Sequence, residues 1–283
     1  MIKILVTGAN GYIGRHVVNA LLDKGADVIA CDLVVDEVDN RAERVSMNLF
    51  DLPDEINIFE HLGTPDVCLH MAWRNGFVHN ASTQLGDLSA HYNFLTRIVD
   101  DGLKQLAVMG SMHEVGYWEG AINENTPCNP ISMYGIAKDT LRRAMMLYTQ
   151  QKGCILQWLR GYYILGDDKH NNSIFCKLLL AAEEGKKTFP FTMGKNQYDF
   201  IELDDLANQI STVVLQNEIT GIINCCTGKP MSLADRVEQF IKDHNLDIKL
   251  EYGAFPDRPY DSPCIYGDPT LINTIMSKSL LNG

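Results

Sequence analysis

Residues 1–14 read MIKILVTGANGYIG, and this stretch decides the fold. The apolar run at residues 2–6 predicts a buried strand, and apolar positions recur at helical spacing over residues 14–24. Between the two, glycines let the backbone turn tightly and approach a pyrophosphate, which then lies on the helix N-terminus. The alternatives are a plain strand–helix turn, or a flavin or other nucleotide as ligand. In this context the loop predicts a dinucleotide site formed by Gly8, Asn10, Gly11, Tyr12, Ile13 and Gly14.

The rest of the chain alternates short apolar runs with helical patterns. Strands are predicted at residues 26–31, 65–71, 105–109, 155–160 and 221–226, and helices at 92–102, 134–152 and 203–216. This alternation predicts an α/β protein with a Rossmann fold, a doubly wound parallel sheet covered on both faces. The alternation breaks over residues 166–200 and again after residue 228. We therefore expect a Rossmann domain at residues 1–165, joined by 200–228, and a smaller discontinuous C-terminal substrate-binding lobe formed by 166–199 and 229–283.

The composition argues against several classes of protein. The 283 residues carry a formal net charge of −12, which disfavours a nucleic-acid or membrane-surface partner. No apolar run has the length of a membrane span, and residues 1–14 do not resemble a signal peptide. Neither the eight cysteines nor the eight histidines show metal-ligand spacing, so we expect no metal. The scattered cysteines are typical of a reduced, cytoplasmic protein.

The end of the second predicted strand indicates which dinucleotide is bound. Asp32 stands there, 18 positions past Gly14, where a carboxylate can accept both ribose hydroxyls and would repel a 2′-phosphate. This favours NAD(H) over NADP(H), although Arg15 near the loop is a cation that could meet a 2′-phosphate. A solvated strand-end Asp32 is the alternative. Asp51 and Leu52 follow another short segment and are candidate adenine contacts.

A tyrosine and a lysine stand one helical turn apart in the pattern Tyr134-Gly-Ile-Ala-Lys138. A neighbouring ammonium stabilises a phenolate, so we expect the pKa of Tyr134 to fall below about 10. Such a tyrosine can exchange a proton with a carbonyl or carbinol while a nicotinamide exchanges hydride. This spacing is common by chance on helices, but downstream of a nucleotide-binding loop it is a strong indication of a catalytic pair.

Ser111 is the candidate third catalytic residue, because a hydroxyl at a strand end can hold the substrate oxygen that Tyr134 protonates. Two alignments to the family that the motifs resemble, described in the next paragraph, compete here. Counting back from Gly116 aligns Ser111 with the catalytic Ser/Thr of that family, whereas matching Glu114-Val115 to its Asp-Glu-Val run aligns Met112, whose thioether cannot donate. In the second register the role falls to Ser111 from one residue earlier, to His113, or to no residue. A serine that only caps the turn is the alternative.

These motifs resemble those of the extended short-chain dehydrogenase/reductase family, which includes nucleotide-sugar epimerases, dehydratases and 4-keto reductases. The resemblance covers essentially the whole chain, from the glycine loop to residues 198–207, where Tyr198 replaces the usual Arg. It implies an NAD(H) cofactor held by Tyr134 and Lys138 as well as the loop. It also implies cofactor contacts from Met71, Ala72 and Trp73, in a His-x-Ala-Ala-like motif in which Trp73 replaces a small residue, and from Asn93.

The resemblance also implies a nucleotide-sugar substrate. Arg258, in Asp-Arg-Pro, is similar to a late family arginine that meets the substrate pyrophosphate, and Lys177 is a weaker candidate for the same contact. Tyr162 lies in the segment similar to the one that leads into the substrate lobe. From position alone, His79 follows a strand end, where ligands bind in open α/β sheets, so we expect it, Ser111 and His113 to face the substrate.

Three functions remain open from the sequence. The leading one is an oxidoreductase that transfers hydride between NAD(H) and C4 of a nucleotide-linked, 6-deoxy sugar, as a 4-keto reductase. A nucleotide-sugar 4-epimerase that retains its NAD would use the same residues. A non-catalytic NAD-binding regulatory or scaffold module would not need Tyr134 and Lys138. Family members usually pair through two helices, which predicts a homodimer through residues 92–102 and 134–152.

Overall fold

The computed structural model describes residues 1–166, 173–256 and 261–282. Its centre is a seven-stranded, wholly parallel sheet in the order β3-β2-β1-β4-β5-β7-β11. The strands are β1 (Lys3–Thr7), β2 (Asp27–Asp32), β3 (Glu43–Ser46), β4 (Val67–His70), β5 (Gln105–Ser111), β7 (Ile155–Gly161) and β11 (Gly221–Cys225). The strand order reverses direction between β1 and β4, which makes that crevice the expected binding place for a dinucleotide. The predicted Rossmann fold is confirmed.

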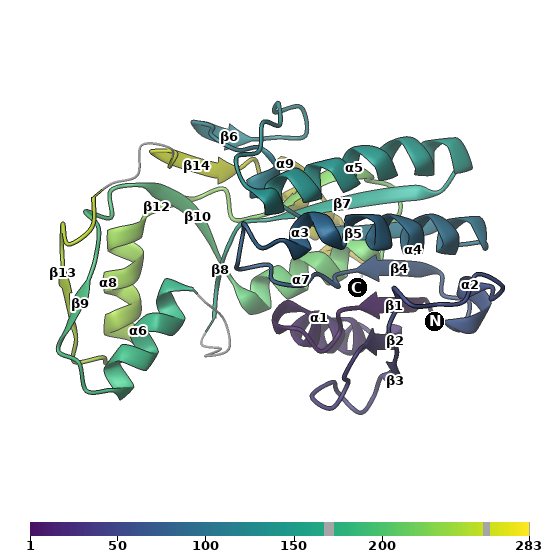
Figure 1. The fold of residues 1–283 in the computed structure, drawn as a ribbon, viewed down its shortest axis with the longest axis horizontal. Coiled ribbons are helices and arrows are strands. Elements are labelled where there is room, and N and C mark those ends of the chain that lie inside the picture. Colours follow the sequence, from purple (N-terminus) through teal and green to yellow (C-terminus); the bar gives the residue numbers. More distant parts are fainter. Residues whose placement is uncertain (167–172, 257–260, 283) are drawn as a thin grey trace.

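Helices cover both faces of this sheet (Figure 1). On one face α1 packs against α7, and α7 against α9; on the other, α4 packs against α5, with the short α2 and α3 beside them. Their bounds are α1 (Tyr12–Asp23), α2 (Ile58–His61), α3 (Thr83–Gly86), α4 (Leu88–Asp100), α5 (Met133–Lys152), α7 (Leu203–Val214) and α9 (Thr270–Asn282). Alternate residues of β1 serve the two faces: Ile4 and Val6 join the core under α1, and Leu5 joins the core under α4.

The remaining elements form two smaller sheets at the end of the molecule toward which β1 points (Figure 1). One sheet contains β6 (Gly120–Ile122), β8 (Tyr163–Leu165), β10 (Gln197–Glu202), β12 (Pro230–Ser232) and β14 (Cys264–Gly267). The other pairs β9 (Thr188–Pro190) with β13 (Lys249–Glu251), near α6 (Ile174–Glu183) and α8 (Leu233–Asp243). Phe175 of α6 and Phe240 of α8 lie 5.0 Å apart between ring centroids.

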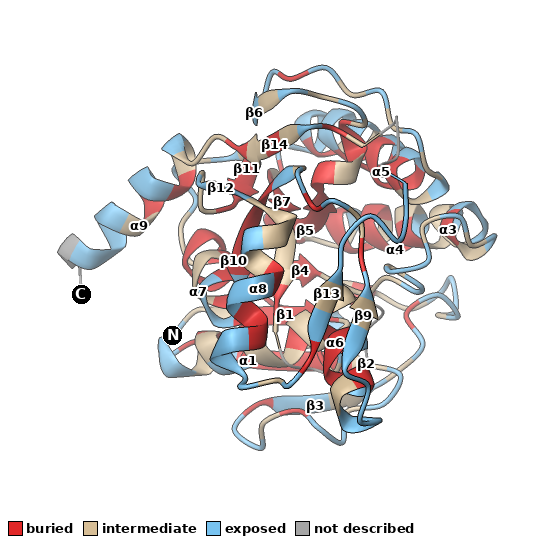
Figure 2. Ribbon diagram, turned by 90° about the vertical axis from the view of Figure 1, so that its left-hand side faces the viewer, coloured by how far each residue is buried: buried red, intermediate tan, exposed pale blue. Residues whose placement is uncertain are grey.

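The predicted division into a Rossmann domain and a substrate lobe remains a proposal. Two elements cross the proposed boundaries. β6 lies within residues 1–165 but pairs with β14 of the five-stranded sheet. α9 lies within residues 229–283 but packs on α7 and β11 of the Rossmann domain. Figure 2 shows α9 extending from the body with largely exposed residues.

Burial follows the layers that the sequence pattern predicts. The strands of the large sheet are almost wholly buried, apart from β3, whose four residues are exposed or half-buried (Figure 2). The polar sequence of β3, Glu43-Arg-Val-Ser46, explains why the apolar pattern did not predict this edge strand. Among the described residues, no helix combines the length and apolar character needed to span a bilayer.

Candidate active site

The glycine loop between β1 and α1 is packed too tightly for side chains. Gly8 has φ +69°, and a Cβ on it would lie 2.6 Å from the backbone nitrogen of Ala72; a Cβ on Gly14 would overlap the carbonyl oxygen of Gly8. Among the described residues no side chain caps the N-terminus of α1 at Gly11, and its first turn holds no acidic residue. Its backbone N–H groups and positive dipole end therefore suit a pyrophosphate.

Asp32 ends β2 beside this loop. Its carboxylate accepts hydrogen bonds from the backbone N–H groups of Asn10 (3.0 Å) and Leu33 (2.7 Å), so it is held at the edge of the loop. Arg15, the residue that argued for a 2′-phosphate, forms an ion pair with Glu37. The arrangement fits the predicted preference for a ribose without a 2′-phosphate, because the neighbouring charges include carboxylates and the guanidinium is paired.

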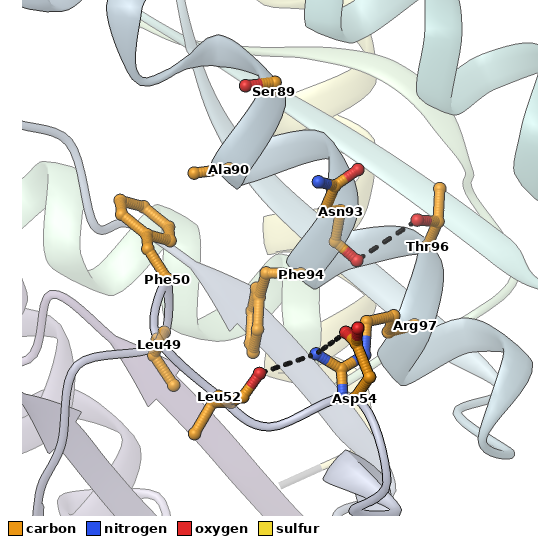
Figure 3. A pocket seen from close by; sticks show the side chains of 10 residues that line it. All are labelled: Leu49, Phe50, Leu52, Asp54, Ser89, Ala90, Asn93, Phe94, Thr96 and Arg97. Atoms are coloured by element: carbon orange, nitrogen blue, oxygen red, sulfur yellow. Dashed lines mark hydrogen bonds and ion pairs between the residues drawn. The ribbon is translucent and has the colours of Figure 1, made fainter.

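Two of the other cofactor candidates meet in a separate cavity. Leu52 and Asn93 both line a cavity of about 300 Å³ between the loop after β3 and α4 (Figure 3). Arg97 closes one side, because its guanidinium donates to the carbonyl of Leu52 (3.1 Å). Leu49 and Phe50 also line the cavity, and the sequence pattern did not single them out. Asp51 is exposed and does not line it.

The proposed proton donor lies at the start of α5. Ser132 caps this helix by accepting from the N–H of Gly135 (3.1 Å), and the N–H of Tyr134 donates to the carbonyl of His79 (2.8 Å). A Cβ on Gly135 would overlap the carbonyl oxygen of His113, so only glycine allows the first turn to approach this closely. The close approach places the Tyr134 phenol beside Ser111 at the end of β5, and the serine hydroxyl acts to lower the pKa of the phenol.

Lys138 points into the protein rather than to the phenol. It is 3 % exposed, its ammonium donates to the carbonyl of Met109 (2.6 Å), and it lies 5.9 Å from the ring centroid of Tyr134. Burial lowers the pKa of Lys138 to about 7, although the nearby Glu114 carboxylate opposes this shift.

The expected fall in the pKa of Tyr134 is wrong for this arrangement. Burial raises the pKa of Tyr134 to about 12, while its hydrogen bond with Ser111 acts in the opposite direction and the Glu114 carboxylate adds to the rise. Loss of hydration around the phenolate is the largest cause of the rise in this pKa, and the ammonium of Lys138 is bound to the carbonyl of Met109 instead of the phenol. Tyr134 therefore holds its proton at neutral pH, as a proton donor must.

The two registers for the catalytic hydroxyl differ clearly in their surroundings. The hydroxyl of Ser111 acts on the pKa of Tyr134, whereas Met112 is 6 % exposed and belongs to the hydrophobic core. Ser111 also caps the 3-10 turn η1 (Met112–Glu114): its hydroxyl accepts from the N–H of His113 (3.3 Å). The capping role and the contact with Tyr134 coexist.

Two histidines expected to face the substrate surround the phenol. The ring of His79 is stacked on Tyr134 at 5.2 Å with an interplanar angle of 12°, and the ring of His113 lies 4.3 Å from that of His79. Burial lowers the pKa of both imidazoles, that of His113 to about 3. Near neutral pH, His113 is therefore an uncharged hydrogen-bonding group beside Tyr134.

Two other substrate candidates, Tyr162 and Lys177, are not brought to this cluster. Tyr162 is buried in the hydrophobic core, and its hydroxyl has no hydrogen-bond partner among the described residues. Lys177 is exposed on α6. Arg258 lies outside the described residues. The contacts of these three side chains with a substrate remain predictions.

Several buried polar residues near the site were not predicted. Thr7 links β1 to β4 through its hydroxyl, which lies 2.8 Å from Nδ1 of His70 and accepts from the N–H of Ala72 (3.3 Å); Met71 continues this pairing by donating its N–H to the carbonyl of Thr7 (3.0 Å). His70 in turn contacts His91 of α4 at 2.9 Å. A polar residue in an apolar strand, such as His70, was the available signal.

Glu114 is the second unpredicted group. It is fully buried and accepts from the N–H of Ser111 (2.7 Å), from the indole of Trp158 (2.8 Å) and from Nε of Arg160 (3.2 Å). Arg142 of α5 lies 3.4 Å from the same carboxylate. This group of residues from β5, η1, β7 and α5 holds Ser111 in place, and no spacing along the sequence revealed it.

Comparison with known proteins agrees with this geometry. Residues 4–226 match the model of the NAD dependent epimerase/dehydratase family. The chain is similar to dTDP-6-deoxy-L-talose 4-dehydrogenase (NAD(+)) of Aggregatibacter actinomycetemcomitans, at 45% identity over 271 residues that cover 94% of this chain and 99% of the relative. It is 25% identical over 276 residues to a putative UDP-glucose 4-epimerase of Methanocaldococcus jannaschii, covering 92% of this chain and 86% of that protein.

Solved structures share the fold. The UDP-N-acetylglucosamine 4-epimerase of Methanobrevibacter ruminantium aligns with a TM-score of 0.83 at 20% identity, over 97% of this chain and 91% of that one. The UDP-glucuronic acid 4-epimerase of Bacillus cereus, solved with NAD, aligns with a TM-score of 0.81 at 19% identity, over 98% and 93% of the two chains. With its glycine loop, Asp32 and Tyr134/Lys138 pair, this chain belongs to the NAD-dependent epimerase/dehydratase family and is an NAD-dependent enzyme.

Proposed function

We propose that this enzyme transfers hydride between NAD(H) and C4 of a nucleoside-diphosphate-linked 6-deoxy sugar, acting as a 4-keto reductase or, in reverse, a 4-dehydrogenase. The observation that carries the chemistry is the placement of Ser111 at the carboxyl end of β5, where its hydroxyl acts on the Tyr134 phenol. The 45% identity to a dTDP-6-deoxy-L-talose 4-dehydrogenase over nearly the full length of both chains supports the substrate class.

The reaction needs a hydride, which comes from the cofactor, and a proton, which comes from this chain's own residues. The nicotinamide, when bound, supplies the hydride for C4. Ser111 donates a hydrogen bond to the C4 oxygen, and Tyr134 delivers its proton to that oxygen as the carbonyl becomes a hydroxyl. Lys138, when protonated, supplies positive charge 5.9 Å from the ring centroid of Tyr134, which favours the phenolate that remains. The ketone, the hydride and the proton together give the alcohol.

We place the cofactor in the crevice at the switch of strand order. The N-terminus of α1 at Gly11 would hold the pyrophosphate, and Asp32 would bind the adenosine ribose. His79 and His113, beside Tyr134, face the sugar. Arg258 and Lys177 remain proposed contacts of the substrate diphosphate. Tyr162 remains a proposed substrate contact at the start of the lobe.

The experiment that tests this function uses purified enzyme with dTDP-6-deoxy-L-talose and NAD⁺, and with the corresponding 4-keto sugar nucleotide and NADH. We expect one NADH formed or consumed for each sugar converted, because a reductase releases the changed cofactor after each turnover. A 4-epimer formed without net change in NADH would favour the epimerase, which the UDP-glucose 4-epimerase relatives at about 25% identity exemplify. NAD binding without turnover on dTDP-, GDP- and UDP-sugars would favour a non-catalytic module.

We also propose a homodimer formed through α4 and α5. The exposed apolar side chains Ile136, Met146 and Leu147 of α5 support this surface. Sedimentation equilibrium of the protein and of Leu147→Lys tests it: the wild type should sediment as a dimer and the variant as a monomer. We further propose a cytoplasmic location, since no disulfide joins cysteines within the described residues.

A further inference from the structure

An indole lies against the ammonium of the proposed catalytic lysine. The centroid of the Trp73 ring is 3.7 Å from Nζ of Lys138, and the same ring is stacked on His91 at 4.4 Å with an interplanar angle of 14°. The edge of Trp73 faces Tyr134, with 6.0 Å between ring centroids. The indole therefore contacts Lys138 and borders the phenol at the same time.

One buried amide fixes this indole. Gln84 of α3 is 1 % exposed, and its Oε1 accepts from the indole N–H of Trp73 (2.8 Å). Its Nε2 donates to the carbonyls of Asn75 (2.8 Å) and Val78 (3.2 Å). Both amide protons and the carbonyl oxygen are thus used, so the amide has one favourable orientation. The loop that Gln84 holds leads directly into His79, whose carbonyl accepts from Tyr134.

We propose that Trp73 and Gln84 are positioning residues for the Tyr134/Lys138 pair: Gln84 holds the indole of Trp73 against the Lys138 ammonium, and holds the loop that carries His79 against Tyr134. The proposal rests on the proposed function for the roles of Tyr134 and Lys138. It goes beyond that function by assigning to Trp73 a task that the small residue usual at this position in the family cannot perform.

The physical need for the indole follows from the surroundings of Lys138. Its ammonium is buried, and within the described residues no carboxylate lies at ion-pair distance from it. Glu114 of η1, the acidic group that acts on it, is bound by Arg160. The negative face of an aromatic ring stabilises a cation without bringing a proton acceptor, and it does so most strongly in a desolvated site.

The other titratable groups around Lys138 do not share its charge near neutral pH. These are His70 on β4, His91 on α4 and Tyr134 on its own helix. Burial lowers the pKa of both histidines, that of His91 to about 3, and raises that of Tyr134 to about 12. A titration near pH 7 in this cluster therefore reports on Lys138.

Two substitutions of Trp73, to Leu and to Phe, distinguish the effect of the aromatic ring from the effect of side-chain volume. Trp73→Leu keeps an apolar side chain but removes the aromatic face, and Trp73→Phe keeps a ring; both variants lose the N–H that donates to Gln84, so they differ in the ring alone. The ionisation of Lys138 is followed by NMR of ¹³C-lysine-labelled protein, with its resonance assigned through Lys138→Arg. We expect Trp73→Leu to lower the pKa of Lys138 by about one unit, as a desolvated cation–π contact predicts, and Trp73→Phe to shift it by less than half as much. Equal titration of the wild type and both variants would overturn the role of Trp73.

The role of Gln84 is tested by Gln84→Met, which keeps the volume and removes all three hydrogen bonds. We expect kcat to fall about tenfold or more with the KM for NADH unchanged, and the pKa of Lys138 to move in the same direction as in Trp73→Leu. The matched control is Thr83→Val, which removes only the hydrogen bond that Thr83 accepts from the Asn75 side chain (3.0 Å) and should change neither quantity. If Gln84→Met and Thr83→Val behave alike, Gln84 has no positioning role.

These measurements distinguish an error in the positioning roles of Trp73 and Gln84 from an error in the proposed function. If Tyr134→Phe retained full turnover, the proposed chemistry would be wrong, but the NMR titration would still decide whether Trp73 stabilises the charge of Lys138. If Trp73→Leu does not fold, the shift in Gln84→Met decides the question: an unchanged Lys138 titration in that variant contradicts the proposal.

Discussion

The backbone N–H of Tyr134 donates to the carbonyl oxygen of His79 at 2.8 Å, and the ring of His79 is stacked on the phenol of the same Tyr134 at 5.2 Å. One residue of the loop after β4 thus fixes both the backbone and the side chain of the proposed proton donor. This pairing joins two segments 55 positions apart (134 − 79) and orients the phenol toward Ser111.

Replacing Tyr134 with Phe should remove the proton donor and leave the fold intact. Turnover should fall by about 10² or more, because general acid catalysis contributes at least that factor. NADH affinity, measured by fluorescence titration, should stay nearly unchanged. Turnover at the wild-type level would show that Tyr134 does not donate the proton.

Ser111→Ala and His113→Ala should differ in turnover at saturating NADH. Ser111→Ala removes the hydroxyl proposed to hold the substrate oxygen beside Tyr134, so we expect a large loss of kcat, about 10²-fold. His113→Ala should cost less, because its ring contacts Tyr134 only edge-on at 6.0 Å. The reverse order of losses would assign the hydroxyl's role to His113.

Asp32→Ala should narrow the preference for NADH over NADPH. The carboxylate that Asn10 and Leu33 hold at the end of β2 is the proposed ribose ligand, so its loss weakens NADH binding most. Dissociation constants of both cofactors, measured by calorimetry, check this. A wild-type enzyme that binds NADPH more tightly than NADH would contradict the assignment of Asp32.

Glu114→Gln should destabilise the protein by about 3–5 kcal/mol, since it leaves the buried Arg160 without its carboxylate partner. Urea unfolding followed by circular dichroism measures the loss. Glu124→Gln, at an exposed position, is the control and should stay within about 0.5 kcal/mol of the wild type. Equal stability of the two variants would show that the buried ion pair is dispensable.

Acid should destabilise the fold partly through His91. Its pKa is lowered from 6.5 to about 3 by burial, with Lys138 adding to the effect. As pH falls below 6.5 the unfolded chain binds this proton before the folded one, so stability present above pH 6.5 is lost toward pH 3, by about 1.4 kcal/mol per pH unit. His91→Gln should reduce the slope of unfolding free energy against pH by about one proton, whereas His61→Gln, at an exposed position, should not. An unchanged slope in His91→Gln would mean that the pKa of His91 is the same in the folded and unfolded states.

Most of the large sheet was predictable, because its strands are buried on both faces and appear as apolar runs. β3 and α3 were not: β3 is a polar edge strand and α3 is a four-residue helix, so neither has enough periodic apolar positions to be recognised. Gln84 lies on that short helix, and its partners Trp73 and Val78 are near in sequence without any motif that joins them.

The Rossmann fold, the place of the glycine loop and the spacing of Tyr134 and Lys138 on one helix face could be read from the sequence, because each depends on residues close together in the chain. The charge state of that pair could not, because it depends on tertiary contacts. Burial raises the pKa of Tyr134 to about 12 and lowers that of Lys138 to about 7, and burial depends on segments distant in the sequence, such as Met109 and Trp73 at Lys138. The tertiary structure likewise decided that Ser111, rather than Met112, contacts Tyr134, because that contact depends on how closely Gly135 lets α5 approach η1.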